Sequence, residues 1–213
     1  MRKVTAALFI SLDGVVEAPN RWQFDAFDAE MLAAAMTQQL ARQDTVLLGR
    51  VTYEEWAPYW LTSTDEPFAS YINAVPKYVV STTLQRVDWR NAMLVQGPLA
   101  ETITRLKQQP GKTIGVAGSP TLVRSLLQAG LLDELRLMIH PVIVGSGKRP
   151  FQDGDPLQRL QVVDSRRPAR GSCTSRISRT ETGSSCHRTA GVACCAPDRL
   201  GTVVVRVHLP ACS

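Results

Sequence analysis

Segments typical of β-strands and of α-helices alternate along the first 166 residues, and this alternation constrains the fold more than any other feature. Apolar runs rich in β-branched residues predict strands at residues 3–12, 45–48, 77–83, 92–96, 113–117 and 135–144. Apolar residues at helical spacing predict helices at residues 28–42, 98–108 and 119–130. Strands separated by helices favour an α/β fold with a central, mostly parallel sheet that helices cover on both faces.

The boundaries of the predicted helices carry capping signals. Asp28 is placed to cap the first helix, and Pro98 lies in the first turn of the second. Ser119 and Pro120 begin the third helix, which Gly130 ends. In a sheet of this kind, ligands bind at the carboxyl ends of the strands, where the chain turns into a helix. Candidate sites therefore follow residues 12, 48, 80 and 116.

A candidate phosphate site follows the second predicted strand. Gly49 comes directly after an apolar run, and Arg50 and Thr52 open a helix. Glycine lets the backbone approach a ligand, a helix N-terminus favours an anion, and the two side chains add donors for phosphate oxygens. An ordinary strand-to-helix turn with a solvated arginine explains these residues equally well.

A second glycine-containing turn lies further along the chain. Gly115, Gly118, Ser119 and Thr121 fall in a strand, a turn and a capped helix, which is the arrangement that a pyrophosphate needs. The full G-x-G-x-x-G pattern and the acidic residue that binds a ribose are missing from the sequence. A simple tight turn at Gly118 remains an alternative.

Polar side chains also end two other predicted strands. Ser81 and Thr82 are placed either to bind a phosphate or to satisfy local backbone groups. Asp13 follows the first strand and precedes a glycine, and it is the candidate catalytic residue. Its carboxylate would hydrogen-bond the N–H groups of a heterocycle or assist protonation. The alternative is a turn aspartate that bonds its own backbone.

Aromatic residues and the histidine in the last strand give weaker indications. His140 lies within a long apolar run, which favours a histidine satisfied in the core. Trp22, Trp56 and Trp60 are expected to contribute to the core rather than to line a pocket.

Charge and cysteine are concentrated after residue 166. The net charge of +5 arises there, because residues 167–213 hold seven arginines, no lysine, and only two acidic residues. All five cysteines lie in the same stretch, without the C-x-x-C spacing of a zinc site, so no metal is expected. A basic tail without aromatic residues gives little support for nucleic-acid binding. DNA affinity that falls steeply with salt would be its signature.

The sequence also predicts a cytoplasmic protein without a membrane span. No apolar run approaches the roughly 18 residues that a spanning helix needs. The basic residues and apolar stretch at the N-terminus resemble a signal peptide, but Asp13 and Glu17 interrupt the stretch and no small-residue cleavage site follows.

Five segments, taken in order, resemble the dihydrofolate-reductase-like family, and most closely its branch typified by the reductase domain of bacterial riboflavin biosynthesis. They are ISLDGV, LGRVTYE, VVSTTL, VAGS and DELRLMIHPVIVGSGK, which begin at residues 10, 48, 79, 116 and 133. The last segment is the most specific. The ordered set is far more specific than any one member, and the resemblance covers about residues 2–166.

The resemblance implies a dihydrofolate-reductase-like fold whose mainly parallel sheet has an antiparallel edge. It also implies NADPH as the cofactor and hydride transfer to a small pterin-like or ribosylaminopyrimidine-like substrate. By position, the cofactor-binding residues are Gly49, Arg50, Thr52, Ser81, Thr82, Gly115, Gly118, Ser119 and Thr121, and Asp13 lies near the substrate. The alternative is a protein that binds a pyridine nucleotide without turnover.

Two departures from the family pattern affect the cofactor site. Relatives often carry an arginine, suited to a 2′-phosphate, shortly after the serine that matches Ser81, whereas this chain has Thr82 and Thr83. The preference for NADPH over NADH is therefore open. Ala117 replaces the usual second glycine, which is a mild change.

The resemblance ends at about residue 166, which predicts a reductase domain over residues 1–166 and an atypical Arg/Ser/Cys-rich tail over 167–213. Relatives continue into a short turn and a final antiparallel strand, and they pair as dimers partly through their C-terminal strands. The tail has the composition of a frame-shifted or disordered segment. The alternative is a long inserted loop that leads to the missing strand at residues 201–209. A homodimer is compatible with the resemblance.

Overall fold

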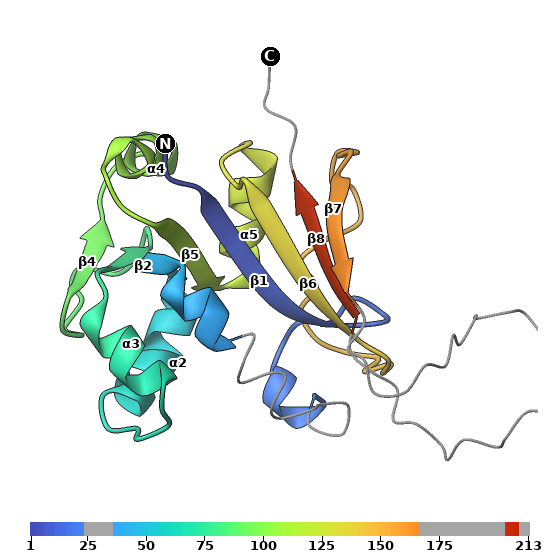
Figure 1. The fold of residues 1–213 in the computed structure, drawn as a ribbon, viewed down its shortest axis with the longest axis horizontal. Helices are drawn as coiled ribbons and strands as arrows, with labels where there is room; N and C mark the ends of the chain where they lie inside the picture. Colours follow the sequence, from blue (N-terminus) through green and yellow to red (C-terminus); the bar gives the residue numbers. More distant parts are fainter. Residues whose placement is uncertain (24–35, 167–202, 209–213) are drawn as a thin grey trace, which may run out of the picture.

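A computed structural model of the chain describes residues 1–23, 36–166 and 203–208 (Figure 1). Its strands form one sheet in the order β4-β3-β2-β5-β1-β6-β8-β7. The strand bounds are β1 Val4–Ser11, β2 Gln43–Gly49, β3 Lys77–Val80, β4 Ala92–Val95, β5 Thr113–Gly118, β6 Glu134–His140, β7 Gln161–Arg166 and β8 Val203–His208. The six strands from β4 to β6 all pair in parallel. β8 pairs antiparallel with β6 and with β7.

Helices cover both faces of this sheet, as the sequence predicts. They are α2 Arg50–Trp60, α3 Phe68–Ala74, α4 Leu99–Gln108 and α5 Pro120–Gln128, with a 3-10 turn at Pro19–Arg21 and a helical stretch at 36–41. In Figure 1, α5 passes behind β1 and β6, whereas α2 and α3 lie at the lower left. The architecture is therefore α/β with a parallel central sheet.

Alternation along the strands divides the core into two clusters. On one face, α4 and α5 pack with the side chains of β1 that alternate from Val4 to Ile10. On the other face, Tyr53 of α2 and Ile72 of α3 pack against Val46 and Leu48 of β2. The side chain between these two, that of Leu47, belongs to the first cluster, as the two-residue period of a strand requires.

Several predicted boundaries are wrong by a few residues. The strand expected at 135–144 ends at His140, because the backbone turns at Pro141 and beyond. The strand expected at 77–83 ends at Val80, because Ser81 bonds its own turn. Pro98 is the N-cap of α4 rather than a residue of its first turn.

Other differences concern whole elements. Helix α3 was not expected from the sequence, since its seven residues give too short an apolar pattern. The start of the helix expected at 28–42, with Asp28 as its cap, lies outside the described residues. Within the apolar run predicted at 201–209, residues 203–208 form β8, which lies between β6 and β7, so the sheet contains strands from both sides of residue 166.

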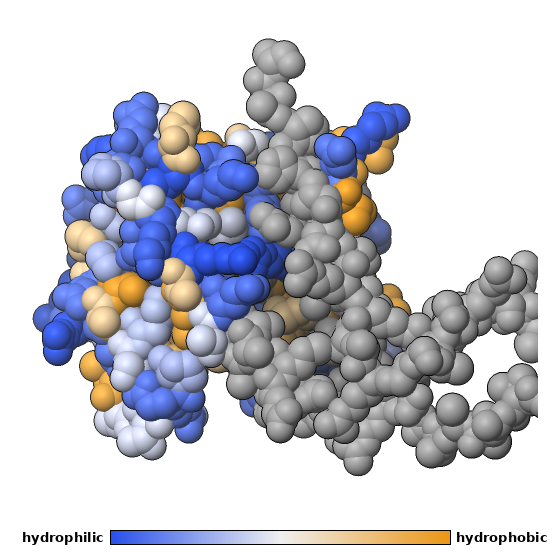
Figure 2. All heavy atoms as spheres, in the orientation of Figure 1, coloured by the Kyte–Doolittle hydropathy of each residue, from blue (hydrophilic) through white to orange (hydrophobic). Residues whose placement is uncertain are grey.

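The surface of the described residues is mixed. Figure 2 shows small groups of hydrophobic residues scattered among hydrophilic ones on the face that it presents. Among the described helices, none combines the length and the apolar character that crossing a bilayer requires.

Candidate functional site

The carboxyl ends of four parallel strands lie side by side at one edge of the sheet. The register pairs Leu48 of β2 with Gly118 of β5, and Gly49 with Val80 of β3. β1, which ends at Ser11, pairs with the other side of β5. The segments that the sequence singles out after residues 12, 48, 80 and 116 are thus brought to a common edge.

Gly49 and Ser119 form one close contact between two strand-to-helix junctions. Gly49 is the N-cap of α2, and Ser119 is the N-cap of α5. A Cβ atom placed on Gly49 would lie 2.6 Å from Ser119 Oγ and 3.0 Å from the Ser119 backbone nitrogen. The absence of a side chain at residue 49 is therefore what lets the first turns of α2 and α5 approach each other.

Gly118 and Thr52 form a second close contact at the same place. Gly118 has φ +135°, a value that L-residues with a Cβ rarely adopt. A Cβ on Gly118 would also lie 2.8 Å from Thr52 Oγ1, and the Thr52 side chain is buried. Four of the predicted cofactor residues thus form two closely packed pairs, Gly49 with Ser119 and Gly118 with Thr52.

The backbone at these junctions can accept an anion. Ser119 Oγ accepts a hydrogen bond from the Leu122 N–H, at 3.4 Å, which caps α5. The N-cap of α2 is a glycine and forms no side-chain cap. The first-turn N–H groups of α2 therefore remain oriented toward the same edge of the sheet.

Two predicted cofactor residues at the starts of α2 and α5 are exposed, namely Arg50 and Thr121. Arg50 Nη1 lies 2.7 Å from Glu54 Oε2, an i,i+4 pair in which both side chains are 44% exposed. Such a pair contributes little to stability and separates easily. Thr121 is exposed in the first turn of α5.

Ser81 and Thr82 follow β3 at the far end of this edge. Ser81 Oγ accepts hydrogen bonds from the N–H groups of Thr83 and Leu84, at 3.1 and 3.0 Å. The hydroxyl of Ser81 thus satisfies local backbone groups, which is one of the two roles that the sequence predicts. Its other predicted role, in phosphate binding, stays a prediction. Thr82 is exposed beside it.

Gly115 is separated from the other predicted cofactor residues. It lies inside β5 opposite Val46, three positions before Gly118. A Cβ at residue 115 would lie 2.3 Å from Gln43 Oε1, so the glycine makes room for the Gln43 side chain. Packing against Gln43 therefore accounts for this glycine without a ligand.

Asp13 joins the loop that follows β1 to the loop that follows β6. Its carboxylate accepts hydrogen bonds from Ser11 Oγ at 2.7 Å, from the Val144 N–H at 3.0 Å and from the Gly145 N–H at 2.8 Å. These bonds, above all that from Ser11, hold the pKa of Asp13 far below its usual value. An acid this strong is a poor proton donor, so the arrangement supports hydrogen bonding by Asp13 rather than protonation.

Further contacts that the sequence did not predict join the same two loops. Lys148 Nζ lies 3.0 Å from Glu17 Oε1, and the Val16 N–H donates to the Lys148 carbonyl. Arg149 Nε donates to the Asp13 carbonyl at 2.8 Å. The segment at residues 133–148 marks this region in the sequence, but no local pattern reveals partners more than 130 residues apart.

Asp13→Asn is expected to loosen this loop pair without unfolding the protein. The amide that replaces the carboxylate loses the charge that strengthens the bonds from Val144 and Gly145. Hydrogen exchange at those two amides should speed up at least tenfold, and Asp153→Asn, on an exposed carboxyl group, should leave it unchanged. Unchanged hydrogen exchange in Asp13→Asn would show that the Asp13 carboxylate does not hold the two loops together. A loss of turnover with a shifted pH profile would instead support Asp13 as a catalytic residue.

His140 ends β6 opposite Ser11, beside these loops. Its ring is fully buried and lies 5.8 Å from the Phe9 ring and 5.5 Å from the Trp22 ring, centroid to centroid. Burial lowers its pKa, so the imidazole is neutral near pH 7. The predicted core position of His140 is confirmed. Trp22, Trp56 and Trp60 are each partly buried, and the last two pack against the second core cluster.

Metal ligands do not gather in the described part of the chain, where no group of three or more His, Cys, Asp or Glu side chains could hold an ion. All five cysteines fall outside the residues that the structure describes.

Two curated proteins are similar to this chain in sequence. The chain is 31% identical over 170 residues to the uncharacterized protein YyaP of Bacillus subtilis (strain 168), which covers 78% of this chain and 88% of YyaP. It is 28% identical over 155 residues to the uncharacterized protein YwjB of the same organism, covering 71% and 84% of the two chains.

Solved structures share the fold at low sequence identity. A protein assigned to riboflavin biosynthesis from Shewanella sp. PV-4 gives a TM-score of 0.67 at 16% identity, over 97% of this chain and 98% of that one. Dihydrofolate reductase from Enterococcus faecalis, complexed with NADP(H), gives 0.55 at 12% identity, over 97% and 95%. A pyrimidine reductase-like protein from Corynebacterium diphtheriae gives 0.56 at 15% identity, over 97% and 91%.

The fold is thus that of the dihydrofolate-reductase-like proteins, as the sequence segments predict. The family model of the RibD C-terminal domain matches residues 2–174, which include β1 to β7 and both glycine junctions. This chain belongs to the RibD C-terminal domain family.

Proposed function

We propose that this protein is an NADPH-dependent reductase that transfers a hydride to a small heterocyclic substrate, of pterin-like or ribosylaminopyrimidine-like chemistry. One observation carries the proposal. A Cβ at Gly49 or Gly118 would collide with Ser119 or Thr52, so the strand-to-helix junctions of α2 and α5 pack directly against each other. Two helix starts therefore share one place at the carboxyl edge of a parallel sheet, where dinucleotides bind in open α/β folds.

The residues at this place fit a pyrophosphate. A diphosphate needs N–H donors and favourable electrostatics, and the uncapped first turn of α2 would provide both. The first turn of α5 would add less, because Pro120 has no N–H and the Leu122 N–H donates to Ser119 Oγ. Gly49 and Gly118 let the two helix starts lie together, and Ser119 and Thr52 would add hydroxyl groups.

The adenosine side of the cofactor would extend along the edge toward β3. Arg50 begins α2, and Ser81 follows the strand that neighbours β2. Thr82 is exposed next to Ser81, so its hydroxyl is available to a 2′-phosphate. Arg50 would supply the positive charge for the 2′-phosphate. In relatives this charge often comes from an arginine shortly after the serine that matches Ser81.

The opposite end of the edge, at the end of β1, would receive the substrate. The bound nicotinamide would supply the hydride, and the protein would supply position and electrostatics. The loop pair held by Asp13 borders this end, and its hydrogen bonds fix the backbone of both loops. The Trp22 ring packs edge-on against the buried His140 ring at the same end.

Titration with NADPH tests the proposal directly. Saturable binding, followed by oxidation of NADPH when a pterin or an aminopyrimidine is added, is the expected result. Binding without oxidation by any such substrate would favour the alternative of a nucleotide-binding protein without turnover. Failure to bind either NADPH or NADH would exclude both.

Arg50→Gln is expected to weaken NADPH binding about tenfold and NADH binding much less, since only NADPH carries the 2′-phosphate. Glu54→Gln makes the matched comparison, because it releases Arg50 from its 2.7 Å partner and should tighten NADPH binding severalfold. Equal effects of Arg50→Gln on both cofactors would show that Arg50 does not contact the 2′-phosphate.

A further inference from the structure

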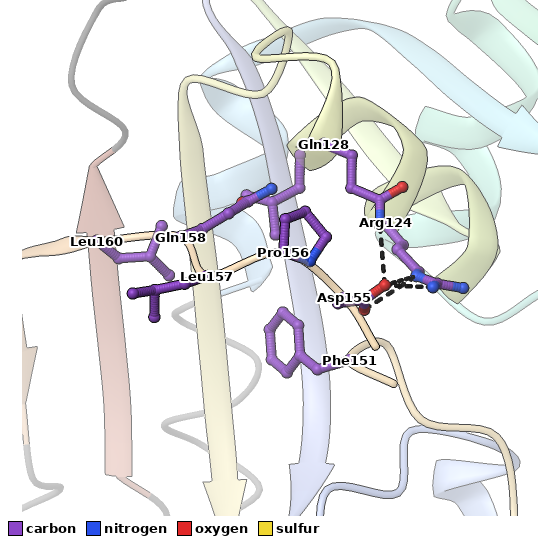
Figure 3. Close-up of a pocket in the computed structure, with 9 residues that line it drawn as sticks. Arg124, Gln128, Phe151, Asp155, Pro156, Leu157, Gln158 and Leu160 are labelled. Carbon is purple, nitrogen blue, oxygen red and sulfur yellow. Dashed lines mark hydrogen bonds and ion pairs between the residues drawn. The ribbon is translucent and has the colours of Figure 1, made fainter. Parts of the chain in front are cut away.

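A cavity lies beside the second half of α5, away from the first turn of that helix, where the cofactor is proposed to bind. It has a volume of about 310 Å³ and lies between α5 and the segment that precedes β7 (Figure 3). Leu127 from α5 lines one side, and Phe151, Pro156, Leu157 and Leu160 line the other. A volume of this size is at the lower end of the range for small-molecule sites.

The apolar side chains around this cavity are not covered by the rest of the described chain. Leu157 is 81% exposed, Phe151 is 42% exposed and Leu160 is 36% exposed. Three large apolar side chains exposed around one hollow are unusual, because scattered single ones are the rule on a protein surface.

The charged groups at the cavity neutralise one another. Arg124 Nε lies 2.8 and 3.0 Å from the two carboxylate oxygens of Asp155, and Arg124 Nη1 donates to Gln152 at 2.8 Å. Gln128 Nε2 and the Gln152 N–H complete the shell of the carboxylate, at 2.9 Å each. A charged ligand would find no free counter-charge in this cluster.

One polar group at the cavity remains unsatisfied. Gln158 Oε1 is shielded from solvent and has no hydrogen-bond partner among the residues that the structure describes. The Gln158 side chain lines the cavity, as Figure 3 shows. A buried acceptor without a partner is costly, and the terminal amide torsion is soft enough to turn this oxygen toward a ligand.

We propose that this cavity binds a small, uncharged, mostly apolar molecule with a single N–H or O–H donor, which pairs with the Gln158 carboxamide. The apolar lining would hold the body of the molecule, and the closed Arg124–Asp155 pair would disfavour ions. The site is separate from the cofactor groove, since it uses Arg124, Leu127 and Gln128 rather than the first turn of α5.

Indole and 1-methylindole form a pair of probes with the same bicyclic ring, in which a methyl group on 1-methylindole replaces the N–H donor of indole. Calorimetric titration of the full chain should give one indole site per chain. Indole should bind about fivefold more tightly than 1-methylindole, the ratio expected of one net hydrogen bond. Saturating NADPH should leave this affinity unchanged.

Variants locate the site. Gln158→Leu should remove the preference for indole and leave 1-methylindole binding intact. Leu157→Arg, at an exposed position on the rim, should weaken both probes at least tenfold. Leu61→Arg is the control, because Leu61 is also exposed, at 54%, and follows α2. Thermal unfolding checks that each variant is folded.

Three results would overturn the proposal. The first is no saturable indole binding, and the second is binding that neither Leu157→Arg nor Gln158→Leu changes. The third is a dimer, seen by sedimentation, that Leu157→Arg dissociates, because a second copy of the chain would then be the occupant of the cavity.

Discussion

Gly118→Ala is expected to abolish measurable NADPH binding at micromolar protein and to lower the free energy of unfolding by about 2–4 kcal/mol. A φ of +135° is strained for alanine, at a cost of roughly 1–3 kcal/mol. The added Cβ would also lie 2.8 Å from Thr52 Oγ1, and Thr52 is buried and cannot move away freely. Denaturant unfolding and fluorescence titration with NADPH measure the two effects.

Two further variants separate these causes. Gly130→Ala has a positive φ of +66° but open space around the new Cβ, so it should cost only about 1–2 kcal/mol and leave NADPH binding intact. The double change Gly118→Ala with Thr52→Ala removes the hydroxyl contact and should recover part of the stability. If Gly118→Ala behaves like Gly130→Ala in both measurements, the contact with Thr52 does not form the site.

Lys77→Met is expected to lower the free energy of unfolding by about 2–4 kcal/mol, because it removes a fully buried hydrogen-bond donor. Lys77 Nζ donates to the carbonyls of Ile72 and Val75, at 2.7 and 2.9 Å, near the C-terminal end of α3. It also lies 4.9 Å from the centroid of the Trp89 ring. Methionine fills the space but leaves the two carbonyls without their donor.

Lys112→Met is the matched control for this change. Lys112 Nζ also donates to a carbonyl, that of Ala41 at 2.9 Å, but the residue is exposed, and its loss should cost less than about 0.5 kcal/mol. Equal costs for the two substitutions would show that burial of Lys77 does not strengthen its contacts.

The pH dependence of stability gives an independent test of Lys77. Burial lowers its pKa in the folded protein to about 8, from an ordinary value of 10.5. Between these values the unfolded chain binds more protons than the folded one, so the contribution of Lys77 to the free energy of unfolding rises with pH across this window. Denaturant unfolding at pH 8 and at pH 10 should show this rise in the natural protein, and Lys77→Met should remove it.

Asp13 illustrates a residue whose position follows from sequence and whose chemistry does not. The apolar run before it and the glycine after it place Asp13 at a strand end. Its pKa depends on Ser11 nearby and on the N–H groups of Val144 and Gly145, which are 131 and 132 residues away along the chain. Only the folded chain shows that these groups hold the carboxylate as an anion.

Gly115 and Gly118 also differ in a way that only the folded chain shows. Both are glycines of one short segment, and sequence reasoning assigned both to a nucleotide site. In the sheet, Gly118 ends β5 against Thr52, whereas Gly115 lies three positions earlier under Gln43. Which neighbour a glycine faces depends on strand register, and register is not visible in a single strand.

The sequence by itself determined the parallel α/β layout, since two-residue and helical periods are local properties of the chain. It also determined which strand ends carry glycine, hydroxyl and carboxylate groups. Only the tertiary structure decided that β2 and β5 are neighbours, that Gly49 meets Ser119 and Gly118 meets Thr52, and that β8 lies between β6 and β7. These facts depend on pairing between segments far apart in the chain, and the packing of the whole sheet, rather than any local pattern, selects that pairing.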